Sequence, residues 1–192
     1  MKLFFKIFKF FIILLFVVGA AFAFMIHIYA NFYKIDDNVY RSAQLNSLNT
    51  SYYLQKYKIK TVLNLRGEPK SGTKWFDDEK KRVEQNGAQL ISYDMFAGRF
   101  YDYKATSDLV NILRDSPKPL LIHCLNGADR TSLVSALYSY GVLNQTQDEA
   151  FKQLSWYYGH VPFFRPHVIA MDNSLLNYIK KRESVNKIKT AE

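Results

Sequence analysis

The sequence has a single cysteine, Cys124, among its 192 residues. No intrachain disulfide can form, and no metal site that needs several cysteines can be built. We also find no internal repeat and no low-complexity linker. With 48% hydrophobic residues, a chain of this length supplies one well-buried domain rather than two. Any special role of Cys124 is therefore chemical.

The formal net charge of +9 does not by itself indicate a nucleic-acid partner. A basic balance suits an anionic substrate, an anionic membrane surface or plain solubility equally well. No nucleic-acid motif is present, so we expect no such partner. Basic residues gather near the two ends of the chain, at Lys2, Lys6 and Lys9 and at Lys180, Lys181, Arg182, Lys187 and Lys189.

A long apolar run lies near the amino terminus, after a basic flank at residues 1–9. Residues 10–29 carry no formal charge, and twenty such residues are what a helix needs to cross a membrane. The run predicts one transmembrane anchor. The alternative is a cleaved signal peptide, because a small-x-small triplet occurs at 21–23. The apolar run continues past this triplet to Tyr29, which favours retention.

The charges around this run predict its orientation. Three lysines and the amino terminus precede it, whereas Lys34 behind it is soon offset by Asp36 and Asp37. The positive-inside rule then places the amino terminus in the cytoplasm. We expect a single-pass membrane protein whose remaining domain faces outward, into the periplasm if the source is a Gram-negative bacterium.

The rest of the chain alternates between apolar strand patterns and amphipathic helix patterns. After an extended entry at 38–44, strands are predicted at 61–67, 89–95 and 120–124, and helices at 48–58, 74–86, 103–116, 131–142, 145–158 and 166–182. Alternation predicts a single α/β domain with a largely parallel central sheet flanked by helices. This domain spans 35–182, and a polar tail follows at 183–192.

The segment from His123 to Thr131 lies between a predicted buried strand and a predicted helix. Backbone N–H groups and the helix dipole favour an anion there. The thiolate of Cys124 can attack phosphorus, Gly127 permits a tight turn, and Arg130 offers a planar fork to phosphate oxygens. Thr131 can hydrogen-bond the sulfur as it becomes a leaving group. The expected phosphate-binding residues are Leu125, Asn126, Gly127, Ala128, Asp129, Arg130 and Thr131.

With Cys124 fixed, the motif also needs a His directly before it, a Gly three residues later, an Arg six later and a Ser or Thr seven later. These four positions have a combined chance probability on the order of one in a hundred thousand. The motif HCLNGADRT, with VYRSAQ and LNLRG, resembles the cysteine-dependent protein tyrosine and dual-specificity phosphatase superfamily. It is most similar to the bacterial branch with a Gly-x-Asp-Arg loop. The resemblance covers about 35–182 and implies a dual-specificity-phosphatase-like fold and a phosphocysteine intermediate, with no metal and no cofactor. Ser132 departs from the glycine of many members.

Three aspartates compete as the general acid that protonates the leaving oxygen. Families whose loop ends Asp-Arg, including myotubularin-like lipid phosphatases, resemble this chain and are thought to use the loop aspartate, so Asp129 is ranked first. Asp94, about thirty residues before the cysteine, resembles the usual superfamily position and is ranked second; Asp102 is third. The alternative role for Asp129 is to orient Arg130, and for Asp94 and Asp102 to be solvated loop charges.

Other polar and aromatic residues are assigned no firm role. Arg41 and Arg66 follow predicted strands and can help to bind a substrate anion, although surface pairing is the more common role. His160 and His167 lack metal-ligand spacing, and His27 lies inside the anchor. Aromatic residues that can wall a cleft, meet lipid or belong to the core are Phe96, Phe100, Tyr101 and Tyr103.

The expected function is a phosphate monoester hydrolase. Its substrate is a protein phosphotyrosine or phosphoserine, or an envelope phospholipid or glycan phosphate, the last two being favoured by an outward-facing site. Loops that take polyanionic inositol phosphates tend to carry lysines where this one has Asn126, Ala128 and Asp129. The alternative is a catalytically silent phosphate-binding module of the same fold. Intact Cys124 and Arg130 favour the enzyme.

Overall fold

A five-stranded sheet forms the centre of the domain in the computed structural model, which describes residues 2–27, 29–70 and 72–189. The strand order is β1-β2-β5-β3-β4. Strands β2 to β5 are parallel to their neighbours, and β1 is antiparallel to β2, so the predicted largely parallel sheet is confirmed. The strands are β1 Tyr33–Lys34, β2 Val39–Ser42, β3 Thr61–Asn64, β4 Gln89–Ser92 and β5 Leu120–His123.

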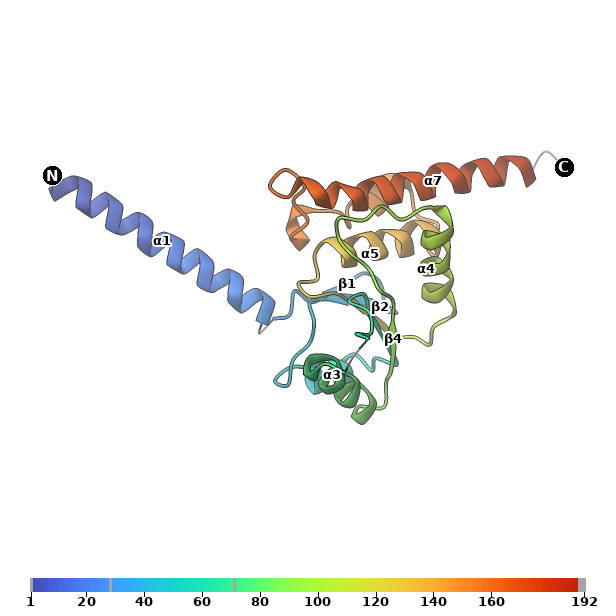
Figure 1. Cartoon of the computed structure of the whole chain (residues 1–192), viewed down its shortest axis with the longest axis horizontal. Helices are drawn as coiled ribbons and strands as arrows, with labels where there is room; N and C mark the ends of the chain where they lie inside the picture. Colours follow the sequence, from blue (N-terminus) through green and yellow to red (C-terminus); the bar gives the residue numbers. More distant parts are fainter. Residues whose placement is uncertain (1, 28, 71, 190–192) are drawn as a thin grey trace.

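Helices cover both faces of this sheet (Figure 1). Helices α2 and α3 lie on one face, whereas α4, α5 and α7 lie on the other. The bounds are α1 Lys2–His27, α2 Thr50–Lys56, α3 Lys74–Gln85, α4 Tyr103–Asp115, α5 Asp129–Gly141, α6 Gln147–Phe151 and α7 Ile169–Lys189, with 3-10 turns η1 Trp156–Tyr158 and η2 Pro166–Val168.

Strand β5 is the central strand and is buried on both faces. Leu120 and Ile122 belong to the core beneath α4, α5 and α7, and Leu121 points to the core beneath α2 and α3. All three are fully buried, which explains why this strand reads as a continuous apolar run. The strand ends at His123, level in register with Asn64 of β3 and Ser42 of β2. Cys124 therefore follows the carboxyl end of the central strand.

Two predicted boundaries are wrong. The helix predicted at 145–158 ends at Phe151, and a 3-10 turn that stops at Gly159, with φ +87°, follows it. The carbonyl of Gln153 accepts a hydrogen bond from Arg41, which helps to draw the chain out of the helical path. The helix predicted to end at 182 continues to Lys189, so α7 includes residues of the expected polar tail; residues 190–192 lie outside the described residues.

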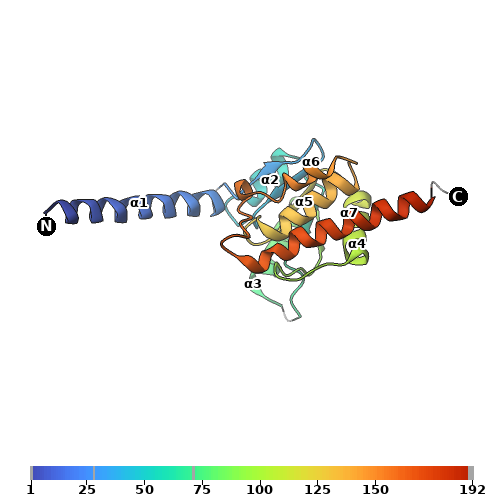
Figure 2. The same cartoon turned by 90° about the horizontal axis from the view of Figure 1, so that it is seen from above.

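Helix α1 projects away from the domain in two perpendicular views (Figures 1 and 2). It begins before the predicted start at Phe10 and ends at His27, while Ile28 lies outside the described residues. Its segment Phe4–Ala21 is uncovered by the domain and is the one helix in the described part of the chain that is long and apolar enough to cross a membrane.

Removal of one buried side chain tests this packing. Leu137 of α5 is fully buried, so Leu137→Ala should lower the free energy of unfolding by about 2–5 kcal/mol. Leu48→Ala is the matched control, because Leu48 is 80% exposed and its truncation should change stability by less than about 0.5 kcal/mol. Urea unfolding of the full chain in detergent measures both. Equal losses would contradict the placement of α5.

Candidate active site

The phosphate loop, residues 124–130, connects the central strand β5 to α5. It lies at the edge of the sheet where the parallel strands end, the usual place for a ligand in an open α/β sheet. The thiol of Cys124 is 3% exposed, and no side chain caps α5 at its N-cap residue, Ala128. The uncapped helix start leaves backbone N–H groups near the thiol for an anion.

Three consecutive carbonyl groups of this loop accept hydrogen bonds from surrounding residues. The pairs are Leu125 O with Gln44 N at 3.2 Å, Asn126 O with Asn31 Nδ2 at 2.9 Å, and Gly127 O with Arg41 Nη2 at 3.1 Å. In a trans peptide the carbonyl and the following N–H point in opposite directions. The next three N–H groups, on residues 126–128, are therefore directed toward the space that the loop encloses. This is the geometry that an anion requires.

Gly127 is required by its backbone conformation and by its close neighbours. Its φ is +67°, and a Cβ built on it would lie 2.6 Å from the carbonyl carbon of Ser42 and from the amide nitrogen of Ala43. The phosphate loop thus packs directly against the end of β2. Any larger residue would force the two segments apart.

Arg41 is fully buried beneath the phosphate loop, so the expectation of surface pairing is wrong for this residue. Its Nη2 donates to Gly127 O and, at 2.7 Å, to Ser132 Oγ, while its Nη1 donates to the carbonyl and the side chain of Gln153. The ring of Tyr158 lies 3.8 Å from the guanidinium carbon. Burial lowers the pKa of Arg41 to about 10, so it stays protonated at neutral pH. Ser132, the departure from family pattern, is one of its acceptors.

Arg130 is held at the other side of the loop. Its Nη1 donates to Leu65 O at 3.2 Å and to Met95 O at 3.1 Å, two carbonyls that follow β3 and β4. These bonds hold the guanidinium group against the segments that follow β3 and β4. Thr131 Oγ1 is buried and has no hydrogen-bond partner within the described residues.

A cluster of polar side chains from His123, Glu79 and Asn64 supports the end of β5 beneath the phosphate loop. Nδ1 of His123 lies 3.2 Å from Cys124 O, and its Nε2 lies 3.3 Å from Glu79 Oε1 without hydrogen-bond geometry. The other oxygen of Glu79 accepts from Asn64 Nδ2 at 3.0 Å. Glu79 sits in α3, whose charged sequence gave no sign that this carboxylate is buried. The group links α3 to the ends of β3 and β5.

Asp129 is bonded away from Arg130. Arg165 binds both oxygens of its carboxylate at 2.9 and 3.1 Å, and His160 Nδ1 lies 2.8 Å from Oδ1. Nε2 of His160 lies 2.9 Å from Asp172. Burial favours a lower pKa for His160, but the bonds to Asp129 and Asp172 together outweigh it and raise the pKa. Sequence reasoning assigned no role to Arg165 or His160. Within the described residues, no three His, Cys, Asp or Glu side chains are placed to hold a metal ion.

The other two aspartates occupy different environments. Asp94 is exposed, packs against Gly67 and precedes Met95, whose carbonyl accepts from Arg130. Asp102 is the N-cap of α4, where its Oδ1 accepts from Ala105 N at 2.9 Å. Asp102 is therefore a helix cap rather than a free loop charge, and Asp94 is the upstream carboxylate next to the arginine of the site.

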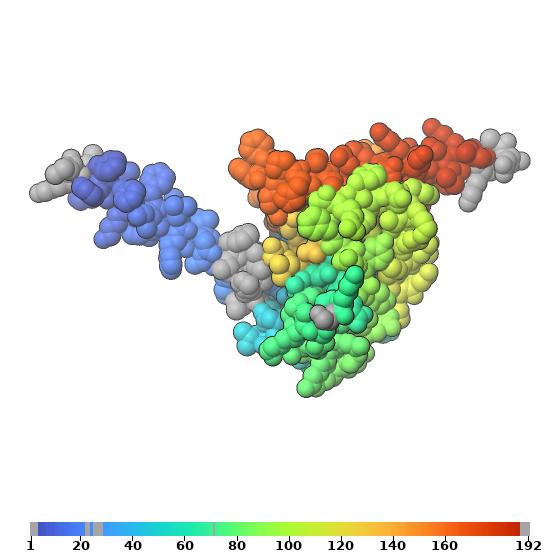
Figure 3. Space-filling model, viewed as in Figure 1, coloured from blue at the N-terminus to red at the C-terminus, as the bar shows by residue number. Residues whose placement is uncertain are grey.

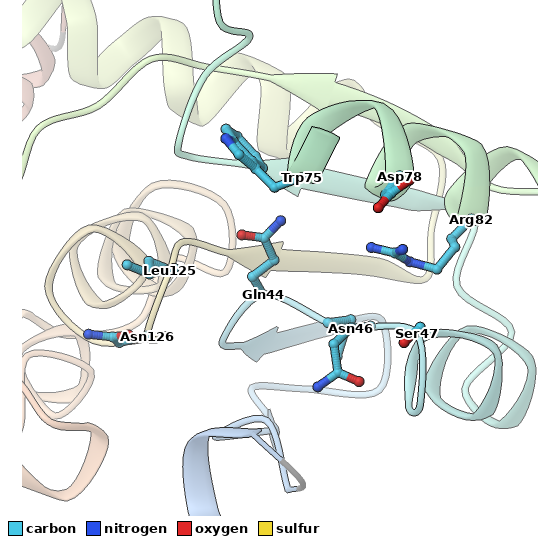
Figure 4. A pocket seen from close by; sticks show the side chains of 9 residues that line it. Gln44, Asn46, Ser47, Trp75, Asp78, Arg82, Leu125 and Asn126 are labelled. Atoms are coloured by element: carbon cyan, nitrogen blue, oxygen red, sulfur yellow. The ribbon is translucent and has the colours of Figure 1, made fainter. Parts of the chain in front are cut away.

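A hollow of about 360 Å³ adjoins the phosphate loop (Figure 4). Trp75 and Arg82 of α3 line one side, and Leu125 and Asn126 of the loop line the other. Arg66 stacks over Trp75, with 3.6 Å between its guanidinium carbon and the ring centre, and donates to the side chain of Gln44. Burial lowers the pKa of Arg66. Arg66 therefore stacks on Trp75 at the border of the site, and the expectation that it pairs with a surface carboxylate is wrong.

The α/β fold and the phosphate loop together are typical of the class of cysteine-dependent phosphatases. The chain belongs to the tyrosine phosphatase family, whose model matches residues 28–138. A relative, the dual specificity protein phosphatase TpbA of Pseudomonas aeruginosa, is 26% identical over 125 residues, which are 65% of this chain and 53% of TpbA. The chain thus spans about half the length of the curated relatives it matches.

Solved structures share the fold. The crystal structure of TpbA gives a TM-score of 0.57 at 23% identity, covering 78% of this chain and 91% of that one. PTPMT1 in complex with PI(5)P gives a TM-score of 0.55 at 14% identity, covering 79% and 98%. At these identities the likeness shows the fold alone. It confirms the expected single α/β domain of phosphatase type.

Replacing Arg41 tests its support of the loop. Arg41→Met leaves buried acceptors without donors, so the free energy of unfolding should fall by about 1–3 kcal/mol. Vanadate affinity should fall at least tenfold, because Gly127 O is released. Arg99→Met is the control, since Arg99 is exposed. Urea unfolding and vanadate-induced thermal stabilisation measure the two effects. Unchanged vanadate affinity would show that Arg41 does not support the loop.

Proposed function

We propose that this protein is a phosphatase that hydrolyses phosphate monoesters through a phosphocysteine formed on Cys124. The observation that carries the proposal is the orientation of the phosphate loop, whose three outward carbonyls turn the following N–H groups inward around the thiol. Arg130 completes the anion site from the helix. Membership of the tyrosine phosphatase family supports the same activity.

The chemistry follows from these positions. The Cys124 thiolate attacks phosphorus while the bond to the leaving oxygen breaks, and that oxygen takes a proton from a carboxylic acid. Inward N–H groups and Arg130 stabilise the charge on the three non-bridging oxygens. Water, losing a proton to the carboxylate left by the first step, then attacks phosphocysteine and breaks the S–P bond. This step releases phosphate and restores both the thiolate and the carboxylic acid. Thr131 donates to the sulfur as it leaves.

For the general acid, the contacts favour Asp94 over Asp129. Both oxygens of Asp129 accept hydrogen bonds from Arg165 and His160, so neither is left to carry a proton toward a leaving group. Asp94 is exposed beside the residue that holds Arg130, and its carboxyl group can turn toward the site. We therefore propose Asp94 as the acid, and Asp129 as the residue that fixes the start of α5.

The proposed substrates are a phosphorylated protein, lipid or glycan. Both an aryl phosphate and a phosphoinositide are represented among the structural neighbours, pTyr in complex with TpbA and PI(5)P in complex with PTPMT1. Because Arg165 compensates the charge of Asp129, the sequence argument against a polyanionic headgroup loses force. We propose that α1 is a single-pass anchor, with the amino terminus cytoplasmic and the domain at 35–182 outward.

The nucleophile is tested by Cys124→Ser. The hydroxyl is a far weaker nucleophile at neutral pH, so hydrolysis of nitrophenyl phosphate should disappear while vanadate or phosphate still binds. Turnover is followed by absorbance, and binding by thermal stabilisation. Substantial hydrolysis by this variant would rule out the covalent mechanism. Binding of vanadate without hydrolysis by the wild type would instead identify a silent binding module.

The acid is tested by comparing two leaving groups. Asp94→Asn should slow hydrolysis of an alkyl phosphate by about a hundredfold to ten-thousandfold, and that of nitrophenyl phosphate far less, because only the alkyl oxygen needs a proton. Asp129→Asn should slow both substrates alike. Asp37→Asn, at a side chain that is 90% exposed, is the control. A leaving-group-selective loss in Asp129→Asn alone would restore Asp129 as the acid.

A further inference from the structure

Four large aromatic side chains project into solvent from the segment that follows α6. Trp156 is 78% exposed, Tyr157 57%, Phe163 88% and Phe164 78%. We call these four residues the aromatic rim. Rings lie in edge-on pairs, with 6.5 Å between the centres of the first pair and 5.1 Å between those of the second. Exposed apolar side chains gathered in this way mark an interaction surface.

The aromatic rim is attached directly to the phosphate loop. Arg165, the residue after Phe164, holds the carboxylate of Asp129 and also donates to Gly159 O at 2.7 Å. A Cβ built on Gly159 would lie 3.4 Å from the Cβ of Ala128 in the loop. Whatever the aromatic rim contacts is therefore next to the phosphate site.

The chain just after α1 is fixed to the same place. Asn31 donates from Nδ2 to Asn126 O of the phosphate loop and, at 3.2 Å, to the carbonyl of Tyr158. The ring of Tyr33 lies 5.1 Å from that of Tyr157. Ala30 and Phe32, which flank Asn31, are also held in place. Ala30 is fully buried, and the ring of Phe32 stacks on that of Tyr53, with 4.3 Å between the ring centres.

These contacts limit the distance between α1 and the site. From His27, where α1 ends, to Asn31 is four residues, which span at most about 14 Å when fully extended. In two perpendicular views, the segment before α7 lies at the end of the domain from which α1 leaves (Figures 1 and 2). In the space-filling view, the orange segment before α7 lies at the end of the domain that faces α1 (Figure 3).

We propose that the aromatic rim enters the interfacial layer of the bilayer that α1 crosses, and that the substrate is the phosphate monoester of a lipid in that bilayer. The polar layer on each side of the hydrocarbon core is about 5–8 Å thick and begins where α1 leaves the core. The contacts of Asn31 and Tyr33 keep the aromatic rim at that end of the domain. Trp and Tyr favour this layer, because their rings are apolar with a polar edge. The lipid assignment rests on the proposed phosphatase function.

Membrane contact can be measured without any turnover, because the chain has only two tryptophans. Trp75→Phe leaves Trp156 as the single tryptophan, and Trp156→Phe leaves Trp75, which lies on α3. Excitation at the red edge of tryptophan absorption avoids the tyrosines. Each full-length variant is reconstituted in phosphatidylcholine vesicles with and without bromine on the upper acyl chain. Bromine should quench Trp156 at least twofold more than Trp75. Equal or absent quenching would overturn the membrane contact.

The lipid substrate is tested with the double variant Phe163→Ser, Phe164→Ser. Hydrolysis of phosphatidic acid in the same vesicles should fall at least tenfold, whereas hydrolysis of soluble nitrophenyl phosphate should stay within twofold of wild type. Equal losses on both substrates, or wild-type preference for a soluble sugar phosphate, would overturn the lipid assignment. If wild type hydrolyses neither compound while Trp156 is still quenched, the phosphatase function fails and the membrane contact stands.

Discussion

The phosphate site depends on one buried cation, the guanidinium of Arg41. A buried guanidinium is costly unless its N–H groups are bonded. Nη1 and Nη2 of Arg41 find acceptors in the phosphate loop, in α5 and in the segment after α6, whereas its Nε has no partner within the described residues. The end of β2, the phosphate loop with the start of α5, and the segment after α6 are far apart in sequence and thus meet at one side chain. Because Gly127 O is one of the acceptors, the cost of burying this charge is coupled to the orientation of the phosphate loop.

From that orientation the chemistry follows. Carbonyls that face outward leave N–H groups that face inward, in the loop that begins at the thiol of Cys124. The outer partners also connect the site to the rest of the protein. Asn31 links it to the end of α1, and Arg165 links it through Asp129 to the aromatic rim. A phosphate loop held between the end of α1 and exposed aromatic rings is the arrangement on which the proposed membrane substrate rests.

Much of this arrangement could be predicted from sequence because it is local. The apolar run of β5 followed at once by Cys124 and Arg130 specifies both the strand and the loop, and alternation of patterns gave the parallel sheet. Contacts between residues that are far apart in sequence could not be predicted from the sequence. Burial of Arg41 and the bonds from Arg165 and His160 to Asp129 leave no periodic signal, and α6 ends early at a segment whose Gln153 carbonyl is used by Arg41.

Trapping the proposed phosphocysteine is the most direct test of how this site works. Full-length protein is mixed with nitrophenyl phosphate in excess, quenched in acid within the first turnovers, digested and examined by mass spectrometry. One phosphoryl group should appear on the peptide that contains Cys124, bound to the cysteine, and should be absent from an unreacted sample. Turnover without any phosphorylated cysteine, or with the phosphoryl group on another residue, would contradict the mechanism.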